Sequence, residues 1–244
     1  MEKRTLSLLA CLFILLSCSS ENTPPETQPE NSVVFSEANS ASTFLNITGI
    51  YYALTETLRD IPATDGLAIN CDNSGTVTVS GNGDDSSGTY TFILTECDNS
   101  YSNPGIRFSG TVTYTFTTPN NTYIDNYSSD TITASDANST FSLSDYAYSE
   151  TVEMISLNSI DTVLQFTYSN TNGERYSVSL GSPIDWSSFS CPNGPVSGEI
   201  LVEGANATQI RATIVSQTVE IEIFDGNTFS PLPGSPFPCS NFFR

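Results

Sequence analysis

Residues 75–94 read GTVTVSGNGDDSSGTYTFIL and predict two β-strands joined by a turn. Apolar and polar side chains alternate over 75–80 and again over 89–94, which is typical of strands with one buried face. The segment 81–87 between them contains only Gly, Asn, Asp and Ser, the residue types that favour turns. The stretch therefore predicts an antiparallel hairpin.

The same alternation predicts strands along most of the chain. Further strands are expected over residues 108–116, 130–133, 140–143, 151–156, 162–168 and 175–180. In the C-terminal third, three more strands are expected from one set of alternating apolar residues: Ile200, Val202, Ile210, Ala212, Ile214, Val219, Ile221 and Ile223. One apolar and one polar face indicate an antiparallel sheet packed on one side.

One helix is predicted ahead of these strands. Its apolar residues recur every three or four positions and so share one face: Phe44, Ile47, Tyr51, Leu54 and Leu58. Ser40 or Ser42 is expected to cap its start, and Pro62 and Gly66 to end it. The predicted fold is mainly β: a curved antiparallel meander sheet, with barrel-like closure as an open alternative. The helix, at about residues 40–60, is expected to pack on the sheet.

The N-terminus predicts export. Lys3 and Arg4 precede an apolar run, residues 6–16, that only Ser7 interrupts. This run is too short to cross a hydrocarbon core of roughly 30 Å as a helix. A basic start, a short apolar run and small residues before a cleavage point are typical of a secretory signal peptide, here residues 1–17.

Leu15-Leu16-Ser17-Cys18 resembles the lipobox of bacterial lipoproteins. The resemblance implies that Cys18 becomes the first residue of the mature chain and carries covalent lipid, including a fatty acyl chain such as palmitate. The sequence around Cys11 fits the same pattern but would leave a much shorter apolar run. Ser19, where retained inner-membrane lipoproteins tend to have Asp, implies the outer membrane and leaves open which leaflet the protein faces.

A tether and one domain are predicted after the signal peptide. Residues 18–39 combine the lipidated Cys18 with a polar segment that contains Pro24, Pro25 and Pro29, so we expect disorder there. Residues 40–244 are expected to form a single β-rich domain.

Four cysteines remain after Cys11 is removed and Cys18 is lipidated, and an oxidising compartment favours disulfides between them. They are Cys71, Cys97, Cys191 and Cys239, which allow three pairings. We favour Cys71–Cys97 and Cys191–Cys239, because the first pair flanks the predicted turn symmetrically. Apolar residues are odd-numbered in 75–80 but mostly even-numbered in 89–94, so this pairing requires a bulge or a loop position for one cysteine. Zinc is disfavoured, since the chain has no His and no Cys-x-x-Cys.

Charge and composition exclude several classes of function. Removing residues 1–17 takes Glu2, Lys3 and Arg4 from the 27 acidic and 7 basic residues, which leaves a net charge of −21 with neither Lys nor His. Such a charge opposes nucleic-acid binding. Catalysis that needs His or Lys is excluded. We expect no enzymatic activity, no catalytic residue, no metal site and no cofactor. Calcium at the oxygen-rich turns 72–75 and 82–85 is a weaker alternative.

The pattern from Cys71 through GTVTVSG and Cys97 to GTVTYTF (110–116) resembles β-rich envelope lipoproteins of Gram-negative bacteria, over about residues 67–118 and the C-terminal hairpins. It implies an exported, outer-membrane-anchored protein that is structural or binds a ligand. The partners expected are the membrane, through the lipid, and a lipid, glycan or envelope protein.

Two alternatives stay open. A curved sheet could bind a lipid or a glycan through its aromatic residues, and the candidate residues are Phe92, Tyr114, Phe116, Tyr123 and Tyr168. The other alternative is a carboxylate-dependent hydrolase, in which two Asp or Glu side chains flank the scissile bond.

Overall fold

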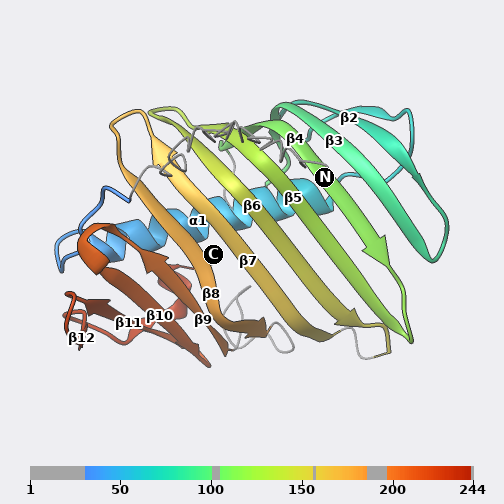
Figure 1. Ribbon diagram of the computed structural model, residues 1–244. Coiled ribbons are helices and arrows are strands. Elements are labelled where there is room, and N and C mark those ends of the chain that lie inside the picture. Colours follow the sequence, from blue (N-terminus) through green and yellow to red (C-terminus); the bar gives the residue numbers. More distant parts are fainter. Residues whose placement is uncertain (1–30, 101–104, 156–157, 186–196, 243–244) are drawn as a thin grey trace, which may run out of the picture.

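The computed structural model describes residues 31–100, 105–155, 158–185 and 197–242, where one long helix precedes a single sheet (Figure 1). The helix α1 spans Ser40–Arg59. The strands are β1 (Ala68–Asn70), β2 (Ser74–Gly83), β3 (Ser87–Asp98), β4 (Arg107–Thr117), β5 (Thr122–Ser135), β6 (Thr140–Glu153), β7 (Asn158–Asn170), β8 (Arg175–Asp185), β9 (Ser197–Glu203), β10 (Gln209–Val215), β11 (Thr218–Phe224), β12 (Phe229–Pro231) and β13 (Phe237–Pro238). Two 3₁₀ turns are η1 (Ala205–Ala207) and η2 (Cys239–Asn241).

Strand order in the sheet follows the chain. Each strand from β1 to β12 is hydrogen-bonded to the next, β13 pairs with β11, and the pairs are antiparallel. The turn between β2 and β3 is closed by the Asp84 carboxylate, whose Oδ1 accepts bonds from the backbone N–H groups of Ser86 and Ser87 at 2.7 and 3.0 Å. The predicted antiparallel meander is therefore confirmed.

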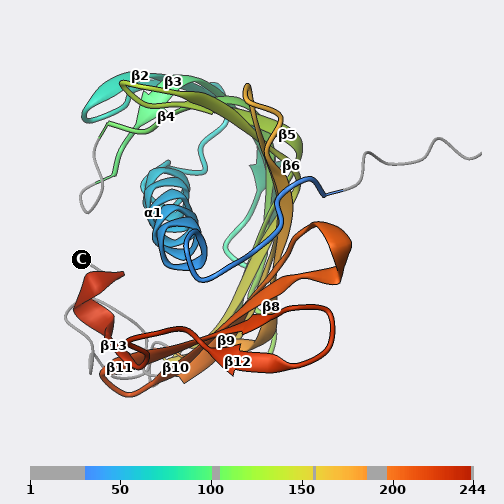
Figure 2. The same ribbon diagram turned by 90° about the vertical axis from the view of Figure 1, so that its left-hand side faces the viewer.

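The sheet curls into an open C-shaped trough around α1 (Figure 2). Register shifts interrupt several strand pairs, including β4 with β5 near Gly110 and β6 with β7 near Asp145, which has a φ of 55°. Such bulges bend a strand and increase its twist, so they favour a curved sheet. In the described part of the chain β1 and β12 do not pair, and the trough does not close into a barrel. Both edge strands have only three residues, which limits their exposed backbone.

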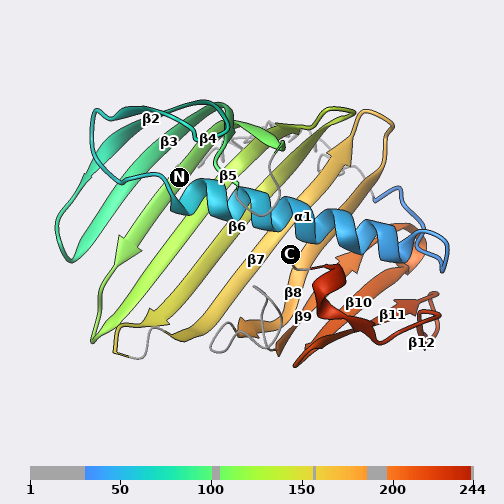
Figure 3. The ribbon, with the colours of Figure 1, turned by 180° about the vertical axis from the view of Figure 1, so that it is seen from behind.

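Helix α1 lies along the concave side of the trough (Figure 3). The predicted apolar stripe is buried, and Phe44 and Ile47 are each 0% exposed. Burial extends beyond the stripe, because Ile50, Ala53 and Thr57 are also at most 1% exposed. The C-terminal segment contributes: the ring of Phe242 lies 5.0 Å from that of Phe44. The helix thus forms the centre of the core rather than a cover on one face.

The start of α1 differs from the prediction. The residue at the N-cap position is Asn39 rather than Ser40 or Ser42, and its side chain makes no capping bond to the first turn. Instead its Oδ1 accepts a 2.9 Å bond from the backbone N–H of Ser36. The Asn39 side chain therefore orders the segment that enters the helix.

Two predicted strands prove to be one. Segments 140–143 and 151–156 were expected to be separate, but residues up to Glu153 belong to the single strand β6. The bulge at Asp145 moves the buried positions from odd numbers, as in Leu143, to even numbers, as in Tyr146 and Tyr148, and so breaks the alternation. Similarly, β5 begins at Thr122 rather than at residue 130. The prediction missed its first half because that half carries polar residues on both faces of the strand, so apolar and polar residues do not alternate there.

The Cys71–Cys97 disulfide is confirmed, with a Cα–Cα distance of 5.5 Å. The required bulge is also present: the register of β2 and β3 shifts next to Ser74, and Glu96 has a φ of 51°. Cys239 is 1% exposed and disulfide-bonded. Cys191 lies outside the described residues, so the Cys191–Cys239 pairing stays a prediction.

Candidate functional site

A row of four side chains, two of them carboxylates, crosses the concave face near the C-terminal end of α1. The register places Phe116 opposite Asp125, Asp125 opposite Glu150, and Glu150 opposite Thr162. These four residues, which we call the acid row, come from β4 to β7 in turn, at steps of about 4.8 Å. Phe116 and Asp125 are partly exposed, whereas Glu150 and Thr162 are buried. Solvent therefore reaches the acid row at its β4 and β5 end.

A row of tyrosines runs beside the acid row, two residues further into the sheet on each shared strand. Tyr90, Tyr114, Tyr127 and Tyr148 lie opposite one another on β3 to β6. The ring centroids of Tyr114 and Tyr127 are 4.7 Å apart with an interplanar angle of 28°. These stacked rings separate the acid row from the aliphatic core.

Glycine makes room for two of the rings. Gly88 lies opposite Phe116 in the register of β3 and β4. A Cβ at residue 88 would lie 2.5 Å from Cε1 of Phe116 and 2.8 Å from Cε2 of Tyr90. Both rings therefore pack directly against the backbone of Gly88, where the acid row and the row of tyrosines reach β3.

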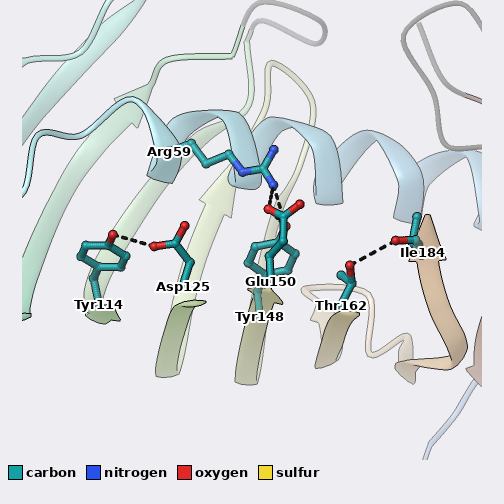
Figure 4. Close-up of polar contacts among 7 residues, drawn as sticks. All are labelled: Arg59, Tyr114, Asp125, Tyr148, Glu150, Thr162 and Ile184. Carbon is teal, nitrogen blue, oxygen red and sulfur yellow. Dashed lines mark hydrogen bonds and ion pairs between the residues drawn. The ribbon is translucent and has the colours of Figure 1, made fainter. Parts of the chain in front are cut away.

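Arg59, the last residue of α1, reaches over the sheet to the acid row (Figure 4). Its Nη2 donates to the Tyr148 hydroxyl at 2.8 Å and forms an ion pair with the Glu150 carboxylate. The Tyr148 hydroxyl donates to the same carboxylate oxygen at 3.0 Å. The Arg59 side chain is 46% exposed and that of Glu150 is 9% exposed. Arg59 therefore ties the helix end to β6 and still presents its guanidinium to solvent.

Asp125 has two tyrosine neighbours. The Tyr114 hydroxyl donates to Oδ1 of Asp125 at 2.6 Å, and the hydroxyls of Tyr114 and Tyr123 are 2.8 Å apart. Burial raises the pKa of Asp125, although the bond from Tyr114 acts in the opposite direction. Burial likewise raises the pKa of Tyr114, so its hydroxyl stays protonated and able to donate.

Replacement of Asp125 by Asn should stabilise the protein at neutral pH. Because the pKa is raised on folding, the stabilising contribution of Asp125 is present below its ordinary value of 3.8 and is lost as the pH rises through the folded-state value. Asn keeps an acceptor for Tyr114 and removes the charge. We expect a higher melting temperature for Asp125→Asn at pH 7 and a smaller difference near pH 3, measured by thermal unfolding across a pH series.

Asp136 supplies a control of opposite sign. Backbone N–H bonds from Asn138 and Ser139 lower its pKa, so Asp136→Asn should destabilise the protein at neutral pH. A lower melting temperature for Asp125→Asn at pH 7 would contradict our assignment of Asp125.

The structure brings some of the predicted aromatic candidates together. Phe116 stacks on Tyr123 with centroids 5.8 Å apart, and Tyr114 lies 5.9 Å from Phe116. Phe92 is buried beneath Tyr114, and Tyr168 lies apart on β7. Cys18 and Cys191 fall outside the described residues, and the Cys71–Cys97 bridge is not part of this cluster.

Sequence patterns did not single out Arg59, Asp125 or Glu150. Hydrogen bonding joins Arg59 to Glu150 across 91 positions, which no local pattern reveals. One signal was available: Arg59 is one of only five arginines after residue 17, and it directly follows the apolar stripe of the helix.

Side chains of the oxygen-rich turns make hydrogen bonds within the protein. Asp84 closes its own turn, and Asn73 donates from Nδ2 to the Asp98 carboxylate at 3.2 Å. Among the described residues, no three His, Cys, Asp or Glu side chains are grouped to hold a metal ion.

Two hollows lie on the sheet outside the part of the trough that α1 fills. One, of about 610 Å³, is lined by hydroxyl and carboxyl side chains at the bulges of β5 and β6, among them Asp130 and Asp145. The other, of about 470 Å³, is lined by Thr89, Thr115 and Phe116 at the end of the β2–β3 hairpin. Alternation points Thr89 and Thr115 to the convex face, away from Tyr90 and Tyr114. Because Phe116 also lines the second hollow, that hollow reaches the exposed end of the acid row.

Within the described ranges, no helix has the length and apolar character needed to cross a membrane. In comparisons with known proteins, no family model, curated protein or solved structure matches this chain.

Proposed function

We propose that this chain is an exported envelope protein, anchored in the outer membrane through lipid on Cys18, that binds a glycan at the acid row. One observation carries the binding proposal: partly exposed stacked rings, Phe116 and Tyr123, adjoin a charged cluster that is also partly open to solvent. Elsewhere the concave face is mainly apolar and occupied by α1.

The chemistry of the site matches a sugar. A pyranose ring has apolar C–H faces and a rim of hydroxyl groups. Aromatic rings contact the faces, and Asp125, Tyr123 and Arg59 offer both acceptors and donors to the hydroxyls. A bond to a charged group is also stronger than one between neutral groups.

Other ligands fit less well. A lipid would need the apolar part of the trough, which α1 occupies with residues such as Phe44 and Leu54. A nucleic acid would be repelled, because the full sequence has a net charge of −20.

A carboxylate-dependent hydrolase is the second candidate, because Asp125 and Glu150 face each other across neighbouring strands. Opposed residues have Cβ atoms about 4.5–5.5 Å apart. From that spacing, the side chains of Asp125 and Glu150 can bring their carboxyl groups to the roughly 5 Å separation found in retaining glycosidases. Arg59 holds Glu150 in an ion pair while burial raises the pKa of Asp125, so the two carboxyls have different environments.

Glycan binding is tested with the purified protein on a panel of neutral oligosaccharides, by calorimetry. We expect binding, and we expect Tyr123→Ala to weaken it about tenfold through loss of one stacking surface. Phe229→Ala is the matched control, since Phe229 is a partly exposed ring on the distant strand β12. If the oligosaccharide binds and the concentration of reducing ends stays constant, the result supports binding alone. If new reducing ends are released, the result supports the hydrolase instead. Equal losses from the two substitutions would refute the site.

The anchor is tested by expressing Cys18→Ser in a Gram-negative host with labelled palmitate. We expect the wild type to incorporate label and to fractionate with the outer membrane, and Cys18→Ser to be unlabelled and released. Cys11→Ser is the control, because the competing lipobox ends at that residue, and it should behave as wild type. Release of Cys11→Ser together with labelling of Cys18→Ser would overturn the assignment.

A further inference from the structure

A cavity of about 230 Å³ lies at the opposite end of α1 from Arg59. Its walls come from three parts of the chain: the segment before the helix, the first turns of α1, and strands β7 and β8 with their connecting turn. The lining residues are Val33, Asn39, Ser42, Thr43, Asn46, Tyr168, Glu174 and Tyr176.

The floor of the cavity is aromatic and rigid. Tyr168 and Tyr176 are 5% and 4% exposed, and their rings stack at 4.6 Å with an interplanar angle of only 10°. Phe35 packs against Tyr176 on one side, and Phe141 packs against Tyr168 on the other. The two tyrosines are therefore held in place from both sides.

The mouth of the cavity is polar and exposed. Ser42, Asn46 and Glu174 are exposed to solvent, and together they offer a hydroxyl, an amide and a carboxylate. Asn46 donates to the Tyr176 hydroxyl across 3.5 Å, the limit of a hydrogen bond, so its amide has capacity for a closer partner. No arginine is among the lining residues, and Glu174 adds a negative charge, so an anionic ligand is disfavoured.

The wall formed by Val33 is fixed by backbone bonds to the sheet. Ser32 donates from its backbone N–H to the carbonyl of Arg175 at 2.9 Å, and Ala205 donates to the carbonyl of Val33 at 2.6 Å. Figure 2 shows this segment passing from the outside of the trough to the start of α1. The cavity is thus preformed, which lowers the entropic cost of binding.

We propose that this cavity binds one neutral sugar ring, either a free monosaccharide or the end residue of a glycan chain. Its volume lies below the 300–1,000 Å³ that is roughly typical of drug-sized ligands, so it suits one ring rather than several. The hydroxyl, amide and carboxylate at the mouth match the hydroxyl rim of a sugar. The proposal does not rest on glycan binding at the acid row.

The test is saturation-transfer NMR on the full-length protein with neutral hexoses and N-acetylhexosamines, each as a free sugar and as a linear trisaccharide. We expect a member of the panel to bind in the millimolar range. Asn46→Ala should weaken binding about tenfold through loss of one hydrogen-bonding group, and Tyr176→Phe should weaken it while keeping the stacked ring. Leu45→Ala, at a 50% exposed position on the same helix turn, should bind as wild type.

The experiment distinguishes a free monosaccharide from the end of a glycan chain, and it distinguishes this cavity from the acid row. Transfer from both free sugar and trisaccharide identifies a site for a chain end, and transfer from the free sugar alone identifies a monosaccharide site. Tyr123→Ala should leave this binding intact, so failure of the acid-row proposal would not affect it. The proposal would be overturned if no sugar gave saturation transfer, or if Asn46→Ala and Tyr176→Phe left binding unchanged. It would also be overturned if ethanolamine, a small cation that could pair with Glu174, bound and the sugars did not.

Discussion

Replacing Cys71 and Cys97 together by alanine should lower the free energy of unfolding by about 3 to 4 kcal/mol. The bridge joins residues 26 positions apart, and on the chain-entropy model closing a loop of that size stabilises the folded state by roughly this amount. Both cysteines are also buried, at 6% and 0% exposure, so the smaller side chains lose packing as well. Urea unfolding followed by circular dichroism measures the change.

The circular dichroism spectrum before unfolding serves as the control, since a spectrum equal to that of the wild type shows that the same folded state is being compared. The slope of the urea curve should stay equal or become steeper, because the chain without the bridge exposes at least as much surface when it unfolds. A loss below about 1 kcal/mol would mean that the bridge does not restrain the chain as the structure implies.

Replacing Arg59 by methionine should cost about 2 to 3 kcal/mol, because it leaves the buried Glu150 carboxylate without its cation. Adding Glu150→Gln should recover part of the loss, since a neutral amide is less costly to bury unpaired. A double-mutant cycle by urea unfolding gives the coupling energy between the two side chains.

The matched control is the pair of Arg107 and Glu96, whose side chains are 42% and 53% exposed and lie 3.4 Å apart. Exposed pairs contribute at most about 1 kcal/mol, so Arg107→Met should have a much smaller effect. If Arg59→Met and Arg107→Met lowered the free energy of unfolding equally, Arg59 would not hold the helix end as we describe.

The alternation of apolar residues was sufficient to predict the architecture. Segments such as 75–80 and 89–94 kept a period of two, apart from the exposed Ile93, and each became part of a strand. The prediction was wrong where a bulge changed the parity: Asp145 divided β6 into two apparent strands. Curvature was expected, but the open trough filled by α1 depends on bulges and edge strands that alternation does not reveal.

The candidate site was only partly predictable. Tyr114, Phe116 and Tyr123 were identified as aromatic residues of a curved sheet, and they do lie together. The charged members were not identified, because the acid row is assembled by strand register and by the length of α1. Arg59 reaches Glu150 only because α1 ends where β6 presents its polar residue.

The central claim is that a glycan binds across the acid row beside Arg59. Its most direct test is to titrate the labelled protein with the best-binding oligosaccharide and to follow the amide signals together with the Nε–Hε signal of Arg59 by NMR. We predict that the largest shifts fall on Arg59 and on residues near Phe116, Tyr123 and Asp125. Shifts confined to the hollow at the bulges of β5 and β6, near Thr111 and Thr131, or absent altogether, would contradict the claim.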